Sequence, residues 1–145
     1  YFLAGDPYHC ECYKTARLVT EKLGLNEDEW QLTFQSRFGP KAWLQPYTDV
    51  TLKKLAANGT KHVQIVCPGF SADCLETLEE IDMQNRAFFT DAGGERFSYI
   101  PALNDSDEHI TTLCKIIETH CQGWDLKTKD LSDSLERAKK IGATQ

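Results

Sequence analysis

Three short strand patterns alternate with helical patterns along the chain, and this alternation restricts the fold more than any other feature. The strand patterns cover Trp30–Gln35, His62–Cys67 and Arg96–Ile100, and helical spacing of apolar residues covers about 8–23, 48–55, 73–92 and 106–120. Such alternation builds an open parallel sheet flanked by helices. The predicted fold class is therefore α/β, with a flavodoxin-like strand order.

The segment after the middle strand carries the densest group of acids. Pro68-Gly69 ends the strand, and a helix follows in which Asp73, Glu76 and Glu80 stand at positions i, i+3 and i+7. At about 100° per residue, the three carboxylates share one helical face. Two interpretations are open at this point. Asp73 can cap the helix with Glu76 as its partner, or the carboxylates can form a functional cluster.

The segments that fit no regular pattern each follow a strand. They are Gly5-Asp6-Pro7, the loop around Trp43, the turn at Asp73 and the turn at Asn104, and the first of them follows a strand expected before Tyr1. Ligands of open α/β sheets bind at the carboxyl ends of the strands. We therefore expect these segments to converge on one edge of the sheet and to form a binding site there.

The residues of this expected site disfavour a nucleotide. The sequence has neither Gly-x-Gly-x-x-Gly nor Gly-x-x-x-x-Gly-Lys, and carboxylates at the sheet edge repel phosphate. Trp43, Tyr47 and Phe70 (with Phe38) supply flat apolar area, and Arg37 supplies a partner for a carboxylate. The set suits a flat apolar ligand with acidic groups, handled beside a cation or a proton acceptor.

Charge and length restrict the partners and the domain count. A net charge of −6 over 145 residues argues against a nucleic-acid partner. No apolar run reaches the roughly 18 residues of a spanning helix. We expect one domain over residues 1–124, followed by a Lys/Asp-rich peripheral helix or tail over 125–145.

The six cysteines lie at positions 10, 12, 67, 74, 114 and 121 and form no Cys-x-x-Cys pair. Their spacing matches neither a zinc site nor an iron–sulfur cluster. We interpret them as free thiols in a reducing cytoplasm.

Several motifs in the same order resemble ferrochelatase, the enzyme that inserts ferrous iron into protoporphyrin IX to make haem. They are Gly5-Asp6-Pro7-Tyr8, the stretch from Gln35 to Pro40, the stretch from Trp43 to Thr48, Pro68-Gly69-Phe70 with the acidic segment Asp73–Glu80, and the stretch from Tyr99 to Asn104. The resemblance covers residues 1–122 and is closest to bacterial members. It implies two similar α/β halves with the porphyrin between them, and this chain corresponds to most of the C-terminal half.

The resemblance also implies roles for particular residues. The catalytic glutamate of the family falls on Glu76, which is also the expected metal ligand, with Glu80 and Asp73 as further candidates. The active-site tryptophan falls on Trp43. Arg37, Phe70 and Tyr47 complete the predicted porphyrin-binding set. Ferrous iron and protoporphyrin IX are then the substrates, the N-terminal half of the same protein is the partner, and no tightly bound cofactor is expected.

The chain departs from the family pattern in two places. Cys74 stands where many members have histidine beside the acidic turn. The family's essential histidine lies in a Ser-x-His-Gly-x-Pro-like stretch that would end just before Tyr1. His9, His62, His109 and His120 match no active-site histidine of the family. We therefore expect the 145 residues alone to be inactive and poorly folded.

The expected strand order gives a structural reason why the 145 residues alone should fold poorly. A flavodoxin-like sheet has its first strand between the second and third, and that strand is expected before Tyr1. His62–Cys67 should therefore pair with Arg96–Ile100, while Trp30–Gln35 should pair with nothing inside the chain.

Metal insertion agrees with the residue-based interpretation of the acidic turn. Two pyrrole protons must leave the porphyrin, and a carboxylate can accept them when burial holds its pKa near the working pH. The resemblance therefore favours the catalytic interpretation of Glu76 over capping. Two other functions stay open, namely a chelatase for another tetrapyrrole, such as a cobalt chelatase, and a porphyrin- or haem-binding domain without catalysis.

Overall fold

The computed structural model describes residues 4–35, 42–124 and 131–143, and it divides into two compact units. The first unit extends to Ser106 and the second begins at Asp107. The predicted boundary near residue 124 stays a prediction.

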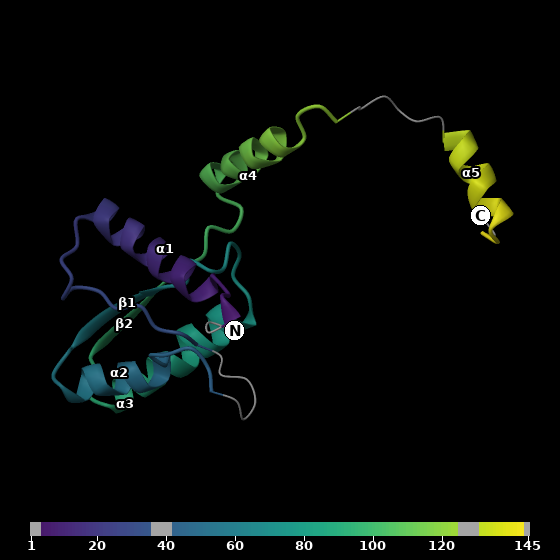
Figure 1. The fold of residues 1–145 in the computed structure, drawn as a ribbon. Coiled ribbons are helices and arrows are strands. Elements are labelled where there is room, and N and C mark those ends of the chain that lie inside the picture. Colours follow the sequence, from purple (N-terminus) through teal and green to yellow (C-terminus); the bar gives the residue numbers. More distant parts are fainter. Residues whose placement is uncertain (1–3, 36–41, 125–130, 144–145) are drawn as a thin grey trace. The chain divides into compact units, whose positions relative to one another are not determined.

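The first unit is built around two parallel strands (Figure 1). Strand β1 (His62–Val66) pairs with β2 (Arg96–Ile100) in continuous register from His62 opposite Arg96 to Val66 opposite Ile100. This confirms the predicted pairing. The helices of the unit are α1 (Tyr8–Leu23), α2 (Thr48–Ala57), η2 (Glu76–Asn85) and α3 (Arg86–Asp91).

Helices lie on both sides of the strands, so the unit is an open parallel sheet flanked by helices, as predicted. In Figure 1, α1 lies on the other side of the strands from α2 and α3. The core lies between β2 and the helices α2, η2 and α3. Its buried members are Leu52, Ala56, Ile81, Phe89 and Phe97, with Val63 and Ile65 of β1 packed against them. Val63 and Ile65 are half-buried between exposed neighbours, as the two-residue period of a strand requires.

The ends of α1 follow the sequence signals. Pro7 stands at its N-cap, and Gly24 ends it in the left-handed region at φ 71°. In this conformation the Gly24 and Leu25 N–H groups donate to the last-turn carbonyls of Glu21 and Thr20. The predicted apolar face of α1 is only partly buried, because Val19 and Leu23 are exposed.

The predicted strand at Trp30–Gln35 is wrong in extent. Within the described residues it is reduced to one parallel bridge between Phe34 and Tyr47, with Phe34 N donating to Pro46 O and Thr48 N donating to Phe34 O. A strand needs a neighbour along its length, and the described part of the chain gives this segment only that one. The prediction that Trp30–Gln35 pairs with nothing inside the chain is therefore wrong at Phe34. Among the described residues, the segment does not pair with β1.

The predicted α-helix over residues 73–92 is also partly wrong. Within that range, Glu76–Asn85 form the π-helix η2, in which hydrogen bonds run from i+5 to i, and the α-helix α3 follows over Arg86–Asp91. Side chains reinforce the wider spacing, since Asn85 Nδ2 donates to Glu80 O at 2.7 Å and Gln84 Nε2 donates to Glu79 Oε1 at 3.3 Å. π-Helical turns are rare and concentrate at functional sites.

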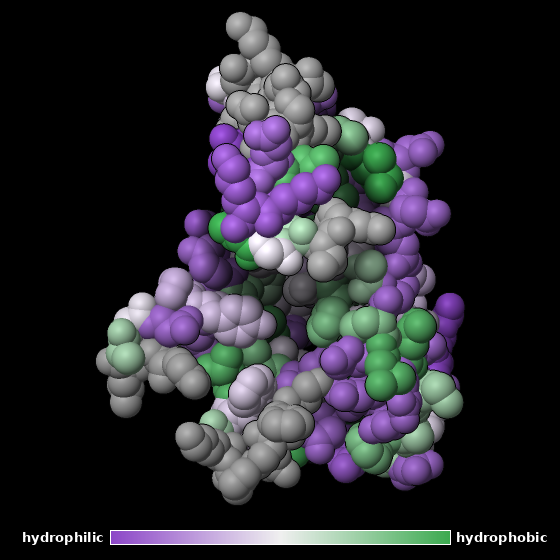
Figure 2. All heavy atoms as spheres, turned by 90° about the vertical axis from the view of Figure 1, so that its right-hand side faces the viewer, coloured by the Kyte–Doolittle hydropathy of each residue, from purple (hydrophilic) through white to green (hydrophobic). Residues whose placement is uncertain are grey.

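The second unit contains α4 (Asp107–His120) and α5 (Leu131–Lys140), both at predicted helical positions. Apolar side chains of α4, among them Ile110, Leu113 and Ile117, are exposed. Exposed hydrophobic residues also appear between hydrophilic ones on the face drawn in Figure 2. Among the described helices, none combines the length and apolar character needed to cross a membrane.

Candidate active site

The candidate site begins at the turn that follows β1. Phe70 N donates to Cys67 O at 3.0 Å, so the chain reverses over Pro68-Gly69 directly after the strand. Phe70 is half-buried. Burial is the main cause that raises the pKa of Cys67 to about 11, and the nearby charge of Asp73 adds to it. The Cys67 thiol is therefore protonated at neutral pH.

Asp73 lies in this turn and accepts hydrogen bonds on both carboxylate oxygens. Oδ1 accepts from the Tyr99 hydroxyl at 2.6 Å, from Thr77 Oγ1 at 3.0 Å and from Ala102 N at 3.3 Å. Oδ2 accepts from Asn104 Nδ2 at 2.8 Å, and Asp73 N donates to Asn104 Oδ1 at 2.8 Å. The turn after β1 and the turn after β2 therefore meet, as the sequence predicted.

These donors keep Asp73 ionised. They lower the pKa of its carboxyl to about 2, with the Asn104 amide as the largest cause and the Tyr99 hydroxyl next. Burial, together with the bond to Asp73, raises the pKa of Tyr99 to about 12. Tyr99 is thus a neutral donor at working pH, and Asp73 is the charged acceptor.

The capping box, one of the two interpretations of the acidic segment, is not formed. Asp73 precedes the helix, and its N–H bonds to Asn104 instead of to Glu76. The N–H of Cys74 bonds to the hydroxyl of Thr77. The helix begins around Leu75, whose side chain makes no cap. The prediction that Asp73 shares a helical face with Glu76 and Glu80 is therefore wrong, because Asp73 is outside the helix.

Glu76 is the first residue of η2 and is half-buried. Its backbone carbonyl accepts from Gln35 Nε2 at 3.1 Å, which brings the segment before the Trp43 loop to the start of the helix. A hydrogen bond from the Cys74 thiol, and then one from its own N–H, lower the pKa of the Glu76 carboxyl. The sequence-based mechanism expected burial to hold this pKa near the working pH. The structure corrects that expectation, since Glu76 is ionised at neutral pH.

Glu80 follows Glu76 by four residues, about one turn along η2, and is half-buried. Its carbonyl accepts from Asn85. Glu76 and Glu80 thus remain neighbours on one side of the helix although the helix is π rather than α. Among the described residues, no group of three or more His, Cys, Asp or Glu side chains is arranged to hold a metal ion.

The aromatic residues of the predicted site are only partly assembled. Trp43 is 41% exposed, as expected for a loop residue that is free to contact a ligand. Tyr47 is half-buried beside Phe34, and the Thr48 hydroxyl after it donates to Thr33 Oγ1 at 2.9 Å. Arg37 and Phe38 lie outside the described residues.

The sequence predicted the turn at Asn104 as part of the site, but it indicated no particular role for the side chains of Tyr99, Asn104 or Thr77. Thr77 is fully buried, and its hydroxyl joins Asp73 to the helix start. Asn104 adopts φ 48°, the left-handed region in which Asn and Asp are enriched. In the sequence, the signal for these polar contacts of Asp73 was an Asn in the turn after a strand.

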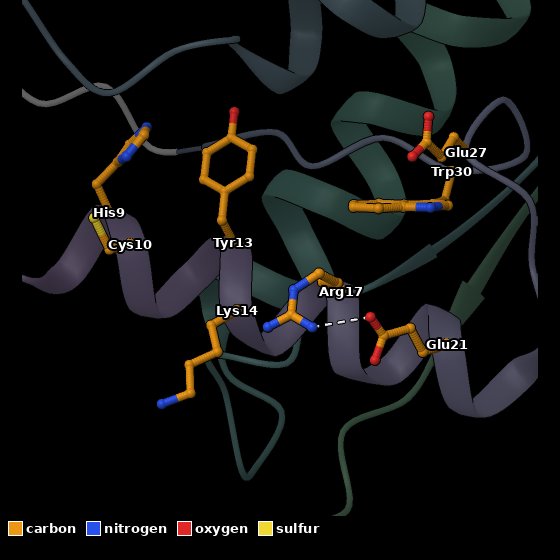
Figure 3. Close-up of a pocket in the computed structure, with 8 residues that line it drawn as sticks. All are labelled: His9, Cys10, Tyr13, Lys14, Arg17, Glu21, Glu27 and Trp30. Atoms are coloured by element: carbon orange, nitrogen blue, oxygen red, sulfur yellow. Dashed lines mark hydrogen bonds and ion pairs between the residues drawn. The ribbon is translucent and has the colours of Figure 1, made fainter.

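One pocket among the described residues lies elsewhere. It has a volume of about 730 Å³ and is an open groove along α1 (Figure 3). The lining residues are His9, Cys10, Tyr13, Lys14, Arg17, Glu21, Glu27 and Trp30. None of the predicted site residues lines this groove. Arg17 pairs with Glu21 at 2.9 Å, so two of the lining charges are already matched. We place the candidate site at the sheet edge, where the turns after β1 and β2 meet at Asp73 and where Glu76 begins η2.

Comparison with known proteins gives a consistent match. A model of the family described as Ferrochelatase matches residues 1–121. The chain is 63% identical to the ferrochelatase of Hydrogenovibrio crunogenus over 124 residues, which cover 86% of this chain and 33% of that protein. It is 56% identical to the ferrochelatase of Pseudoalteromonas atlantica over 143 residues, 99% of this chain and 40% of that protein.

A protein named Ferrochelatase 2, from Shewanella oneidensis, is 60% identical over 116 residues, 80% of this chain and 36% of that protein. The chain thus spans between a third and two fifths of the length of the curated relatives it matches.

Proposed function

Because the chain belongs to the ferrochelatase family, we propose that the full-length protein inserts ferrous iron into protoporphyrin IX to form protohaem. The activity is that of a lyase of haem biosynthesis. The observation that carries this proposal is the match of 56–63% identity to ferrochelatases over a segment that includes the whole acidic turn. The ionised Glu76 at the helix start supports it.

Metal insertion has a simple balance of charge. One Fe²⁺ enters the porphyrin, and the two pyrrole N–H groups each lose a proton. An ionised carboxylate at the edge of the site can accept such a proton and can also contact the incoming cation. We assign this role to Glu76, with Glu80 beside it, and we assign the second acceptor to the essential histidine of the family in the full-length protein.

The porphyrin is proposed to lie against Trp43, with Phe70 and Tyr47 adding apolar contacts and Arg37 facing a propionate. Half-buried and exposed aromatic rings near a sheet edge offer the flat area that such a ligand needs. The N-terminal half of the same protein is proposed to close the other side of the cleft.

We propose the cytoplasm as the compartment. The six cysteines are all free, as expected in a reducing environment. In this proposal iron is a substrate that leaves the protein within the product.

Assays with three metals separate the possible functions. Full-length protein supplied anaerobically with Fe²⁺, Zn²⁺ or Co²⁺ and protoporphyrin IX should form protohaem with iron. A preference for cobalt and another tetrapyrrole would indicate a different chelatase. Tight porphyrin binding with no metalated product from any metal would indicate a binding protein.

Trp43→Ala should weaken porphyrin binding and slow metal insertion while the protein stays folded. The side chain is 41% exposed, so its removal leaves little cavity. Fluorescence titration with porphyrin measures the binding, and thermal unfolding measures the stability. A loss of stability of about 3–5 kcal/mol, the range for truncating a buried Trp, would place Trp43 in the fold instead of the site.

A further inference from the structure

We propose that Tyr99 and Asn104 are positioning residues that hold Glu76 in place through Asp73 and Thr77. The inference rests on the proposed function, because metal insertion is its readout. It assigns Asp73 a structural task in place of the metal contact suggested by the sequence.

The first step is the saturation of the Asp73 carboxylate. Its two oxygens accept four hydrogen bonds from side chains and backbone, and the Tyr99 and Asn104 donors come from 26 and 31 residues further along the chain. A carboxylate with this many donors has little remaining capacity to coordinate a cation or to accept a proton. The same bonds fix the turn after β1 to the end of β2.

The second step connects this network to Glu76. Thr77 is fully buried, and its hydroxyl accepts from Cys74 N at 3.0 Å while facing Asp73 Oδ1 at 3.0 Å and Cys74 O at 3.1 Å. Thr77 is the residue next to Glu76. From the other side, Gln35 Nε2 holds the Glu76 carbonyl. The backbone of Glu76 is thus held directly by Gln35 and indirectly by the hydrogen bonds that tie Asp73 and Thr77 to the turn after β2.

The third step is that the Asp73–Asn104 pair can be exchanged without changing the backbone. Asn104 has φ 48°, and Asp is tolerated there almost as well as Asn. Asn104→Asp removes the amide donor and places a second carboxylate against Asp73. Asp73→Asn removes the charge instead. The double exchange again sets one amide opposite one carboxylate.

The test measures zinc insertion into protoporphyrin IX by the full-length protein. Each single variant should lower kcat about tenfold or more, because a displacement of about 1 Å at a reacting group can cost on the order of 100-fold. KM for the porphyrin should stay within about twofold. The double variant Asp73→Asn with Asn104→Asp should have a higher kcat than either single variant. It should regain at least half of the loss in log kcat, because the effects of two residues in contact are not additive.

Asn26→Asp is the matched control. Asn26 Nδ2 donates to Glu29 Oε2 at 2.8 Å, so the change again sets a carboxylate against a carboxylate, but at an exposed turn outside the network. Its kcat should equal that of the wild type. Tyr99→Phe is the second variant, since it removes only the hydroxyl that donates to Asp73, and it should lower kcat with KM unchanged.

Three results would overturn the proposal. One is a wild-type kcat in Asn104→Asp and Tyr99→Phe. Another is a loss of kcat no larger than the loss in the fraction of folded protein, which circular dichroism measures at the assay temperature. The third is a double exchange no better than the single variants. A wild-type protein that inserts no metal would instead refute the proposed function.

Discussion

Glu76→Gln in the full-length protein is expected to bind protoporphyrin IX within a few-fold of the wild type and to lose metal insertion. The rate should fall by at least about 100-fold, since a positioned proton acceptor contributes roughly 10²–10⁴. The amide keeps the size of the side chain but can neither accept a pyrrole proton nor offer a negative charge to the metal. Zinc insertion into the porphyrin, followed by fluorescence, measures the effect.

The structure explains why this change should leave the fold intact. The N–H groups of Asp73 and Cys74 are already bonded to Asn104 and Thr77, so the Glu76 carboxylate is not their cap. Its lowered pKa depends on local donors, the Cys74 thiol and its own N–H. The thermal midpoint should therefore change little.

Glu79→Gln is the matched control for Glu76→Gln. Glu79 is an exposed acid on the same helix, bonded to Gln84, and its substitution should leave the insertion rate unchanged. Near wild-type zinc insertion by Glu76→Gln would show that Glu76 only stabilises the helix start. Equal losses in both variants would show that the total charge of η2 matters instead of one carboxylate.

Gly94→Ala is expected to destabilise the protein by about 3 kcal/mol, the upper end of the usual range for an overpacked core. A Cβ at this position would overlap the ring of Phe89, with Cε1 as the nearest atom. Phe89 is fully buried, and the centroid of its ring lies 6.3 Å from the centroid of the Phe97 ring. The Gly94 N–H also donates to Phe89 O, so the backbone cannot move away without losing that bond. Denaturant unfolding of the full-length protein measures the change.

A smaller residue at position 89 should relieve the clash. Phe89→Leu combined with Gly94→Ala should cost less than the sum of the two single changes, as expected for residues in contact. Gly69→Ala is the control, because a Cβ at Gly69 would meet nothing within 4 Å. If Gly94→Ala were as mild as Gly69→Ala, the packing of Phe89 against Gly94 would be contradicted.

The local parts of the fold could be predicted from the sequence. The strands β1 and β2 and the helix α1 follow from the periodicity of their apolar residues and from Pro and Gly at their ends. The meeting of the Asp73 and Asn104 turns also follows, because parallel strands bring their carboxyl ends to one edge. These are short-range patterns combined with one rule of topology.

The contacts that define the site could not be predicted in the same way. The π-helical spacing of η2 leaves no distinct mark in the sequence, so an α-helical period placed Asp73 on a face that it does not share. Three of the four donors to the Asp73 carboxylate are 26 to 31 residues away, and nothing in the local pattern around Asp73 identifies them. Trp30–Gln35 has a clear strand alternation, yet a strand forms only where a neighbour is present along it.

The most direct test of the central claim is the conversion of protoporphyrin IX to protohaem by the full-length protein under anaerobic conditions. Fluorescence of the free porphyrin should disappear as ferrous iron is added, with one protohaem formed for each porphyrin consumed and many turnovers for each protein molecule. A porphyrin that stays bound and unmetalated under these conditions would contradict the account.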